Sequence, residues 1–342
     1  MTGSTPWILV EGGGSRTWAA LASGTSTVVE AIGPSTNPRS VGDRQAVSSL
    51  VDLFAGLLPA RGCAVGGVVA AHGAASTTLV AGRFGALLHD ALKTVGVSPR
   101  ATLVMNDIVL PLLTASGPVC VVVAGTGTGF AAWHGQVVTR ASGLEWLLSD
   151  EGGGYHLAVA GLRAVIRALD GRGPATMLID SARRWTTRED LPLQDALFET
   201  VYAPHSKPRV ATFAEQVLVT AAGGDAIAGA LLDEAACHLA TGAEAVCRRC
   251  GVADIPVTLV MTGSLLTQAD GLRSRVEAHL TGRFLLQTTI SHASVDRSAA
   301  DRTETLLRLR QIWDQRPDTF TALSASLPTW ISTTADASPT AP

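Results

Sequence analysis

Two glycine-rich loops, each set between short apolar runs, constrain the fold of this chain more than any other feature. The first, EGGGSRT at residues 11–17, separates two strand-like runs at 7–10 and 17–21. The second, GTGTG at residues 125–129, follows the apolar run PVCVVVA and lies about 114 residues later. Because glycine permits positive φ and leaves backbone N–H groups uncovered, such turns are typical of loops that bind phosphate oxygens. The repetition predicts two related halves that each begin with a β-hairpin.

Alternating apolar and amphipathic stretches indicate that each half is an α/β unit. Further strand-like runs and helical patterns follow the first loop at 27–32, 44–58, 67–71, 83–95 and 102–105. A chain of 342 residues also exceeds the usual size of one hydrophobic core, so two domains are expected. We place these domains at 1–117 and 118–323. The Ser-, Thr-, Ala- and Pro-rich residues 324–342 are expected to form a flexible tail.

Composition argues against several kinds of partner. The formal net charge is -3 and no sustained Lys/Arg run occurs, which argues against nucleic acid and against a charged membrane surface. No apolar stretch reaches the roughly 18–20 residues of a membrane span, and the first residues lack the layout of a signal peptide. We therefore expect a cytoplasmic protein with a small-molecule substrate and neither a nucleic-acid nor a membrane partner.

The cysteines form no even disulfide framework. There are five of them: Cys63, Cys120, Cys237, Cys247 and Cys250. Cys247 and Cys250 make a CRRC pair, a spacing used by redox and metal sites. No second pair accompanies it, and the stretch AEAVCRRCGV is typical of a helix end stopped by Gly251, so a structural role is favoured.

Two polar pairs lie where strands and helices are expected to begin or end. Asn106 and Asp107 follow a buried strand in VMNDIVLPLL, where such a pair commonly makes a strand-ending turn. Asp150 and Glu151 precede an amphipathic pattern in WLLSDEGGGYHLAVAGLRAVIRALDGR. These carboxylates could cap the helix, since free N–H groups and the helix dipole favour negative charge there. They could also accept hydrogen bonds from substrate hydroxyls, and both interpretations stay open.

The motifs resemble those of a known family. EGGGSRT resembles the DGGGTKT phosphate loop, GTGTG resembles GTGSN, and LLSDEGGGYHLAVAGLRAVIRALDGR resembles GDEGSGYWIGREALRAVLRALDGR of the BadF/BadG/BcrA/BcrD ATPases. That family includes the N-acetylglucosamine kinases and belongs to the actin, sugar kinase and heat-shock-protein-70 superfamily. The resemblance covers roughly residues 7–290. It implies an α/β fold of two RNase-H-like domains, of the actin-like ATPase type, with ATP and Mg²⁺ in a cleft between them.

The resemblance also implies roles for individual residues. Asp107 would be the catalytic base and Asn106 would hold the substrate. Further substrate-binding candidates are Asn37, His72, Asp150 and Glu151, although His72 equally suits a satisfied structural histidine. The residues expected to bind ATP are Gly12, Gly13, Gly14, Ser15, Arg16, Gly125, Thr126, Gly127, Thr128 and, beneath the adenosine, Gly263. Glu11 is expected at the Mg²⁺ site, as a direct ligand or through water.

Several positions depart from the family pattern. Glu11 replaces the aspartate of the first loop, and its extra methylene moves the carboxylate by about one bond length. Gly129 stands where the second loop often has asparagine, and Leu144 and Glu145 interrupt a GGWG stretch near the sugar. The C-terminal SVDRSAADRTETLLRLRQIW replaces the usual GALLLA-like helix, although a helix is still expected there. The identity of the substrate is therefore left open.

Three functions compete. The first is an ATP-dependent kinase of an amino sugar such as glucosamine or N-acetylglucosamine, a hexose or a cyclitol, acting as a homodimer. The second is a BadF-type ATPase activator of a dehydratase, which needs exposed cysteines for a shared iron–sulfur cluster. The third is a sugar-binding regulator that has lost catalysis, for which Glu11 is the main argument. The cysteine pattern fits the second function poorly.

Overall fold

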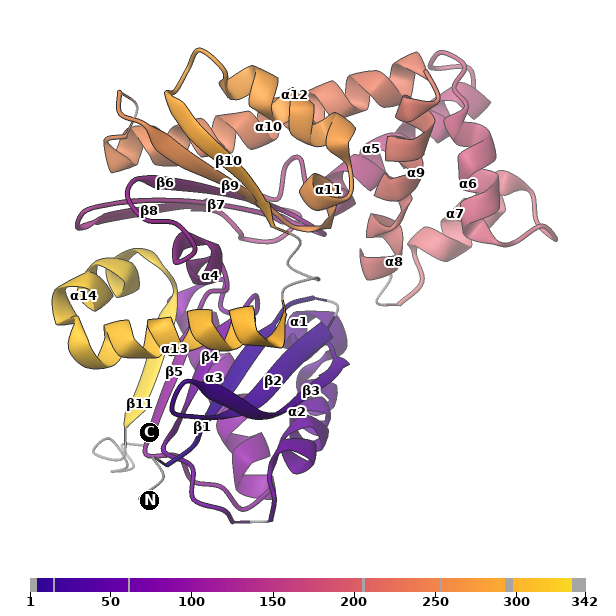
Figure 1. Ribbon diagram of the computed structural model, residues 1–342. Coiled ribbons are helices and arrows are strands. Elements are labelled where there is room, and N and C mark those ends of the chain that lie inside the picture. The colour runs from indigo at the N-terminus through magenta and orange to yellow at the C-terminus, as the bar shows by residue number, and fades with distance from the viewer. Residues whose placement is uncertain are drawn as a thin grey trace. The chain divides into compact units, whose positions relative to one another are not determined.

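The computed structural model describes residues 5–14, 16–60, 62–204, 207–252, 254–292 and 298–333. The chain forms two compact units (Figure 1). Unit 1 comprises Met1–Thr114 together with Arg297–Pro342, and unit 2 comprises Ala115–Asp296. Among the helices of the described residues, none has both the length and the hydropathy that crossing a membrane requires.

Unit 1 is built on a mixed six-stranded sheet with the order β11-β5-β4-β1-β2-β3. Its strands are β1 (Trp7–Gly12), β2 (Arg16–Ser23), β3 (Ser26–Pro34), β4 (Gly67–His72), β5 (Ala101–Met105) and β11 (Thr329–Thr333). β1, β2 and β3 form an antiparallel meander, whereas β1, β4 and β5 run parallel. The predicted hairpin and the alternation of strands with helices are confirmed. Short helices α1 (Pro38–Val41) and α4 (Val109–Leu112) follow β3 and β5.

Helices cover both faces of this sheet. On one face, α2 (Asp43–Leu57) and α3 (Thr78–Thr94) pack on alternate strand residues; the cluster includes Ile8, Val10, Val68, Ala70, Val104, Leu50, Phe54, Phe84 and Leu88. Alternation sends the intervening side chains to the opposite face. There α13 (Ala299–Gln315) contacts β1, β3 and β4, and Trp313 meets Trp7 edge to face at 6.3 Å (Figure 1). Helices therefore cover the central strands on both faces, while much of the edge strand β3 stays exposed.

The C-terminal segment corrects the expected domain boundaries. We expected residues 118–323 to form the second domain and 324–342 a flexible tail. Instead α13 and α14 (Pro317–Ser326) belong to unit 1, and β11 adds an antiparallel strand to β5. Trp330 explains the attachment, because its ring fills the notch left by Gly85 of α3, where a Cβ would lie 2.2 Å from the ring. Residues 334–342 lie outside the described part of the chain.

Unit 2 repeats the hairpin-led arrangement in a five-stranded sheet with the order β10-β9-β6-β7-β8. Its strands are β6 (Val119–Ala124), β7 (Thr128–His134), β8 (Val137–Ser142), β9 (Val257–Thr262) and β10 (Leu286–His292). β6, β7 and β8 form an antiparallel meander, while β6, β9 and β10 run parallel. The second predicted hairpin is therefore confirmed, and with it the α/β class built on two related sheets.

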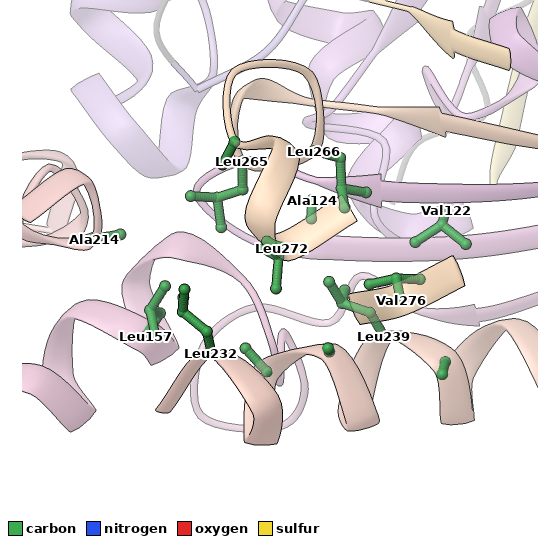
Figure 2. Packing of buried hydrophobic residues seen from close by; sticks show 14 of the residues in the cluster. Val122, Ala124, Leu157, Ala214, Leu232, Leu239, Leu265, Leu266, Leu272 and Val276 are labelled. Carbon is green, nitrogen blue, oxygen red and sulfur yellow. The ribbon is translucent and has the colours of Figure 1, made fainter. Parts of the chain in front are cut away.

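The core of unit 2 lies between its sheet and long helices. α10 (Ala226–Cys250) packs on β6, β7 and β8, and α12 (Asp270–Leu280) lies beside it. Figure 2 shows Val122 and Ala124 of β6 facing Leu239 and Val276 in this cluster. The remaining helices are α5 (Gly154–Leu169), α6 (Leu178–Thr186), α7 (Leu193–Val201), α8 (Lys207–Ala211), α9 (Phe213–Ala222) and α11 (Ser264–Thr267).

The CRRC pair lies at the end of a helix, as expected for cysteines with a structural role. Cys247 and Cys250 occupy the last turn of α10, both are buried, and Gly251 ends the helix with φ 72°. Burial raises the pKa of Cys250 to about 11, which keeps its thiol protonated. Within the described residues, no group of three or more His, Cys, Asp or Glu side chains could hold a metal ion. The structural interpretation is the one that this geometry favours.

Candidate functional site

The candidate site of unit 1 lies where three parallel strands end together. Gly12 at the end of β1 pairs with His72 at the end of β4, and Ala71 pairs with Met105 at the end of β5. Carboxyl ends of neighbouring parallel strands meet at one sheet edge, the usual place for ligands in such sheets. The loops that follow these strands therefore lie side by side.

Loop 1 (residues 12–16) is a tight glycine turn over the end of β4. Gly13 N donates to Arg16 O at 3.2 Å and closes the turn. Gly12 has no room for a side chain, because a Cβ there would lie 2.4 Å from His72 Nε2. Gly14 and Arg16 are exposed, so their N–H and guanidinium groups face solvent. Ser15, also expected to bind ATP, lies outside the described residues.

The Asp107 carboxylate lies beside loop 1. A Cβ built on Gly73 would lie 3.2 Å from Asp107 Oδ2, 3.5 Å from Gly13 Cα and 3.7 Å from Gly12 O. Gly73 N also donates to Gly12 O at 2.8 Å, which holds the loop after β4 against loop 1. Asp107 is partly exposed. A carboxylate and the glycine-rich loop 1 thus share one small area of the surface of unit 1.

The side chain of Asn106 forms hydrogen bonds within the protein. Its Nδ2 donates to Ala75 O at 3.0 Å, and its Oδ1 accepts from Ile108 N at 3.2 Å. The side chain is 7% exposed. These bonds tie the end of β5 to the loop after β4, so they favour a role in shaping the turn that carries Asp107. The expected direct contact with substrate stays a prediction.

Asn37 and His72 have similarly defined positions. Asn37 caps α1, since its Oδ1 accepts from Arg39 N at 3.0 Å. His72 is fully buried and stacks on Phe84 at 4.1 Å between ring centroids. Both of its ring nitrogens bond within the protein, to Ala74 N and to Thr36 Oγ1, at 2.9 Å each. Of the two interpretations that the sequence left open for His72, this geometry favours the satisfied structural histidine.

Glu11 is paired with a residue that the sequence did not suggest. Arg302 of α13 places its Nε 3.5 Å from Glu11 Oε2, and both side chains are largely buried. The guanidinium also lies over the ring of Trp18, 5.8 Å from its centroid. Arg302 is separated from Glu11 by most of the chain, so no local motif could have linked them. The carboxylate expected at the Mg²⁺ site therefore already has a cation beside it.

In unit 2, loop 2 (residues 125–128) is fixed against the start of α5. Gly125 N donates to Gly127 O at 3.0 Å, and Gly154 N donates to Gly125 O at 2.8 Å. Tyr155 N donates to Thr126 O at 2.9 Å. Within the described part of the chain, the N–H groups of Thr126 and Gly127 have no backbone acceptor. Two N–H donors of loop 2 therefore stay available for an anion.

Asp150 is packed directly on loop 2. Its Oδ1 accepts from Thr128 N at 3.1 Å, and a Cβ on Gly127 would lie 2.4 Å from its Oδ2. Its backbone has φ 74°, the left-handed region that non-glycine residues seldom adopt. Burial raises the pKa of Asp150, against the opposing effects of the Thr128 bond and of Lys207. This carboxylate shapes loop 2 whatever else it binds.

The capping interpretation of Asp150 and Glu151 is wrong. α5 begins at Gly154 with Gly153 as its N-cap residue, and no side chain caps it. Glu151 is exposed, two residues before that cap. The alternative, that these carboxylates accept hydrogen bonds from a substrate, stays a prediction.

Gly263 reaches loop 2 from the end of β9. With φ 92°, it begins α11, and a Cβ there would lie 2.4 Å from Ala124 O, just before loop 2. Only glycine fits this approach. The turn after β9 is therefore held against the start of loop 2, while its expected place beneath an adenosine stays a prediction.

One cation near Asp150 escaped the sequence analysis. Lys207 pairs with Glu145, and its Nζ lies 4.5 Å from the centroid of the Trp146 ring. Lys207 comes from α8, 62 residues beyond Glu145, so the pairing has no local signature. The neighbouring Leu147 and Leu148 are 83% and 77% exposed. This segment replaces the expected GGWG stretch with an apolar, charge-paired loop.

Comparisons with known proteins agree with this architecture. Residues 10–285 match the BadF/BadG/BcrA/BcrD ATPase family. No curated protein shows significant similarity to the sequence. The fold is similar to that of the "Putative N-acetylglucosamine Kinase from Chromobacterium violaceum", with 22% identity, a TM-score of 0.64, and 88% of this chain and 99% of that chain covered.

Two further solved structures share the fold. The "Putative N-acetylglucosamine Kinase" of Porphyromonas gingivalis is 15% identical, with a TM-score of 0.61, and 88% of this chain and 97% of that chain are covered. A ROK family glucokinase from Streptomyces griseus, solved with glucose and AMPPNP, is 15% identical with a TM-score of 0.51, covering 90% of this chain and 99% of that one. At such identities the likeness shows the fold.

Proposed function

Because the chain belongs to the BadF/BadG/BcrA/BcrD ATPase family, we propose that it is an ATP-dependent kinase of a sugar or sugar-like substrate. The acceptor would be an amino sugar such as glucosamine or N-acetylglucosamine, a hexose or a cyclitol. The observation that carries this proposal is the Asp107 carboxylate, which lies next to the backbone of loop 1. Phosphoryl transfer uses such a group beside the phosphates to orient the acceptor hydroxyl, whereas an ATPase uses one to orient water, so dependence on an acceptor distinguishes the two functions.

Each unit contains a loop whose donors suit phosphate oxygens in this proposal. Loop 1 offers the exposed Gly14 and the cationic side chain of Arg16. Loop 2 offers the N–H groups of Thr126 and Gly127, since Gly125 N and Thr128 N are already bonded within unit 2. Backbone donors that are fixed before the nucleotide arrives stabilise phosphate charge without reorganising.

Asp107 acts as the base in the proposed reaction. Its carboxylate orients the acceptor hydroxyl and takes its proton while the hydroxyl oxygen bonds to the γ-phosphorus. The bond from that phosphorus to the β–γ bridging oxygen breaks, and ADP leaves with the electron pair. Asn106 keeps the turn that carries Asp107 in place through its bonds to Ala75 O and Ile108 N.

Mg²⁺ would neutralise phosphate charge when bound with ATP. Glu11 is the residue of this chain that would position it, with phosphate oxygens and water as its ligands. The Glu11 side chain is 16% exposed and lies beside the Arg302 guanidinium. A carboxylate in that setting suits a water-mediated contact, in which water rather than the metal bonds to it. We therefore propose that Glu11 orders the waters of the ion.

The test is an ADP-release screen with Mg-ATP over amino sugars, N-acetylated sugars, hexoses and cyclitols, followed by mass analysis of the product. The proposal predicts one acceptor class that gains the mass of a phosphoryl group in step with ADP release. ADP release that no acceptor stimulates would contradict it and favour the ATPase activator. Among the described cysteines, Cys120, Cys247 and Cys250 are buried, Cys63 is partly exposed and Cys237 is exposed. One fully exposed thiol gives a shared iron–sulfur cluster little support, because such a cluster needs several cysteine ligands.

A second candidate is a sugar-binding regulator without catalysis. The observation that favours it is the Glu11–Arg302 ion pair, which places a protein cation beside the carboxylate expected at the metal. This alternative predicts that a sugar binds in calorimetry while no ADP forms in the same screen. The expected homodimer and cytoplasmic location stay predictions under either function.

A further inference from the structure

A buried chain of hydrogen bonds joins three loops at the edge of the unit 1 sheet. Ala74 N lies 2.9 Å from His72 Nδ1, His72 Nε2 lies 2.9 Å from Thr36 Oγ1, and Thr36 Oγ1 lies 2.8 Å from Thr17 Oγ1. His72, Thr36 and Thr17 are each 0% exposed. No water competes for these bonds, so the chain is well placed to act as a rigid connector.

One backbone group fixes the tautomer of His72 and the direction of both of its hydrogen bonds. Ala74 N can only donate, so His72 Nδ1 is the acceptor and the ring proton is on Nε2. Nε2 therefore donates to Thr36 Oγ1. The two threonine hydroxyls share the next bond, in which either can donate, and Thr17 Oγ1 also accepts from Thr36 N at 3.2 Å. Burial lowers the pKa of His72 to about 3, so this neutral tautomer persists at any working pH.

Each end of this chain of hydrogen bonds lies next to a part of the proposed site. Thr17 directly follows loop 1, and Thr36 precedes Asn37 in what we call the acceptor loop (residues 35–37). Ala74 follows Gly73, whose Cα faces Asp107 Oδ2. Ser35 Oγ adds a further link by donating to Gly13 O at 2.9 Å.

The imidazole ring of His72 also packs directly against the end of β1. A Cβ on Gly12 would lie 2.4 Å from Nε2 and 2.5 Å from Cδ2, so loop 1 begins in direct contact with His72. Phe84 stacks on the ring at 4.1 Å and limits its rotation. The ring is therefore held by packing as well as by two hydrogen bonds.

We propose that His72 and Thr36 are positioning residues that hold loop 1, the acceptor loop and the Asp107 region in one fixed arrangement. This inference rests on the proposed function, because it assigns nucleotide and acceptor to those loops. Neither residue touches a reacting atom. Misplacement of reacting groups by about 1 Å can cost 10²-fold in rate, so loss of the chain should lower kcat even where the fold survives.

The central test compares Thr36→Val with Thr36→Ser. Valine keeps the shape and removes the hydroxyl, whereas serine keeps the hydroxyl and removes a methyl group. We expect Thr36→Val to lower kcat about 10–100-fold, and Thr36→Ser to retain most of it at a similar melting temperature. Equal kcat values in the two variants would overturn the proposal, because a purely packing role depends on the methyl group rather than on the hydroxyl.

Substitutions of His72 test its two hydrogen bonds separately, the one to Ala74 N and the one to Thr36. Asn places an amide near the position of Nδ1 and can still accept from Ala74 N, whereas Gln reaches the position of Nε2 and can still donate to Thr36. His72→Asn should therefore resemble Thr36→Val, and His72→Gln should keep more of the rate. His89→Gln is the matched control, since His89 Nε2 bonds Thr102 Oγ1 at 3.0 Å at the opposite end of β5. Its kcat should equal that of the wild type.

Hydrogen exchange separates failure of this inference from failure of the proposed function. Thr36→Val should speed amide exchange together in the segments that contain Gly13, Asn37 and Ala74, whether or not the protein turns over ATP. Faster exchange in one segment alone would contradict the proposal that His72 and Thr36 connect the three segments. Suppose that the wild-type protein releases no ADP while Thr36→Val exchanges faster in all three segments. The kinase proposal would then be rejected, and the role of His72 and Thr36 in connecting the three loops would be supported.

Discussion

At the scale of single residues, Asp107 gives the sharpest test of the chemistry. Asp107→Asn keeps the size of the side chain and a hydrogen-bonding group but removes the basic oxygen. Phosphoryl transfer to the best acceptor should fall by roughly 10²–10⁴-fold, while ATP affinity barely changes. Single-turnover rates and nucleotide titration measure the two quantities. A wild-type rate in this variant would show that another carboxylate, with Asp150 the first to examine, is the base.

Arg302 belongs to the same scale, because one guanidinium lies beside the carboxylate proposed to order the metal's waters. Arg302→Gln removes that positive charge, so Mg²⁺ should need a several-fold lower concentration for half-maximal rate. Arg310→Gln is the control on the same helix, where the guanidinium lies 3.9 Å from the centroid of Trp7 instead. An unchanged Mg²⁺ requirement in Arg302→Gln would mean that Glu11 does not act on the ion.

Asp150 makes a prediction about pH. Burial raises its pKa, so folding favours the protonated form and the ionised carboxylate costs stability at neutral pH. Asp150→Asn keeps an acceptor for Thr128 N, and asparagine tolerates the positive φ better than most residues. The variant should melt a few degrees higher than the wild type near neutral pH, and the gain should shrink as the pH falls toward about 4.

Asp225 is a control for Asp150, because its pKa is shifted in the opposite direction. Burial raises its pKa, but hydrogen bonds from Ala228 N, Met177 N and Thr176 Oγ1 outweigh this effect and lower it overall. Its ionised form therefore stabilises the fold at neutral pH and loses that contribution in acid. Asp225→Asn should melt below the wild type near pH 7. If both variants shift in the same direction, charge at these sites is not what sets the difference.

These residues also show what a sequence can reveal about a site. The two loops and Asp107 could be found because each follows a strand within a few residues, and such motifs are local. Arg302 and Lys207 could not, because their partners Glu11 and Glu145 lie far away in the chain and charged side chains at helical positions usually just face solvent. The roles of Asn106 and His72 in bonding the protein to itself depend on loops that only the folded sheet brings together.

At the scale of elements, β11 is a strand that the sequence analysis assigned to a flexible tail. Its residues TWIST were read with the Ser- and Thr-rich tail, although threonine and tryptophan both suit a strand. Trp330→Ala would empty the space against Gly82 and Gly85 of α3 and should cost unit 1 about 2 kcal/mol, since the ring is only partly buried. Ile331→Ala, in the same strand, should cost less than about 1 kcal/mol.

Thermal or urea unfolding followed by tryptophan fluorescence can measure this difference. Two units need not unfold together, so the midpoint of each transition should be fitted separately. Trp330→Ala should shift one transition and leave the other in place. Similar losses in Trp330→Ala and Ile331→Ala would show that pairing of β11 with β5, rather than the indole, holds the C-terminal segment.

At the scale of the whole molecule, both ends of the chain build unit 1 while unit 2 is one uninterrupted segment. The repeated hairpins could be recognised from the sequence because each glycine loop stands between apolar runs. The return of the chain to unit 1 could not, because Trp330 and Arg302 find their partners only across long sequence separations. Amphipathic periodicity indicates that a helix will pack on a sheet, but not which of two sheets it will cover.

This division has a consequence for synthesis of the protein on the ribosome. Residues 115–296 emerge as a complete folding unit, whereas residues 1–114 must wait for α13 and β11 before one sheet face and one sheet edge are covered. A fragment of residues 115–296 should therefore unfold cooperatively by itself, and residues 1–114 should not. The pairing of Glu11 with Arg302 then forms late, so a nascent chain would complete the surroundings of Glu11, next to loop 1, only after residue 302 has left the ribosome.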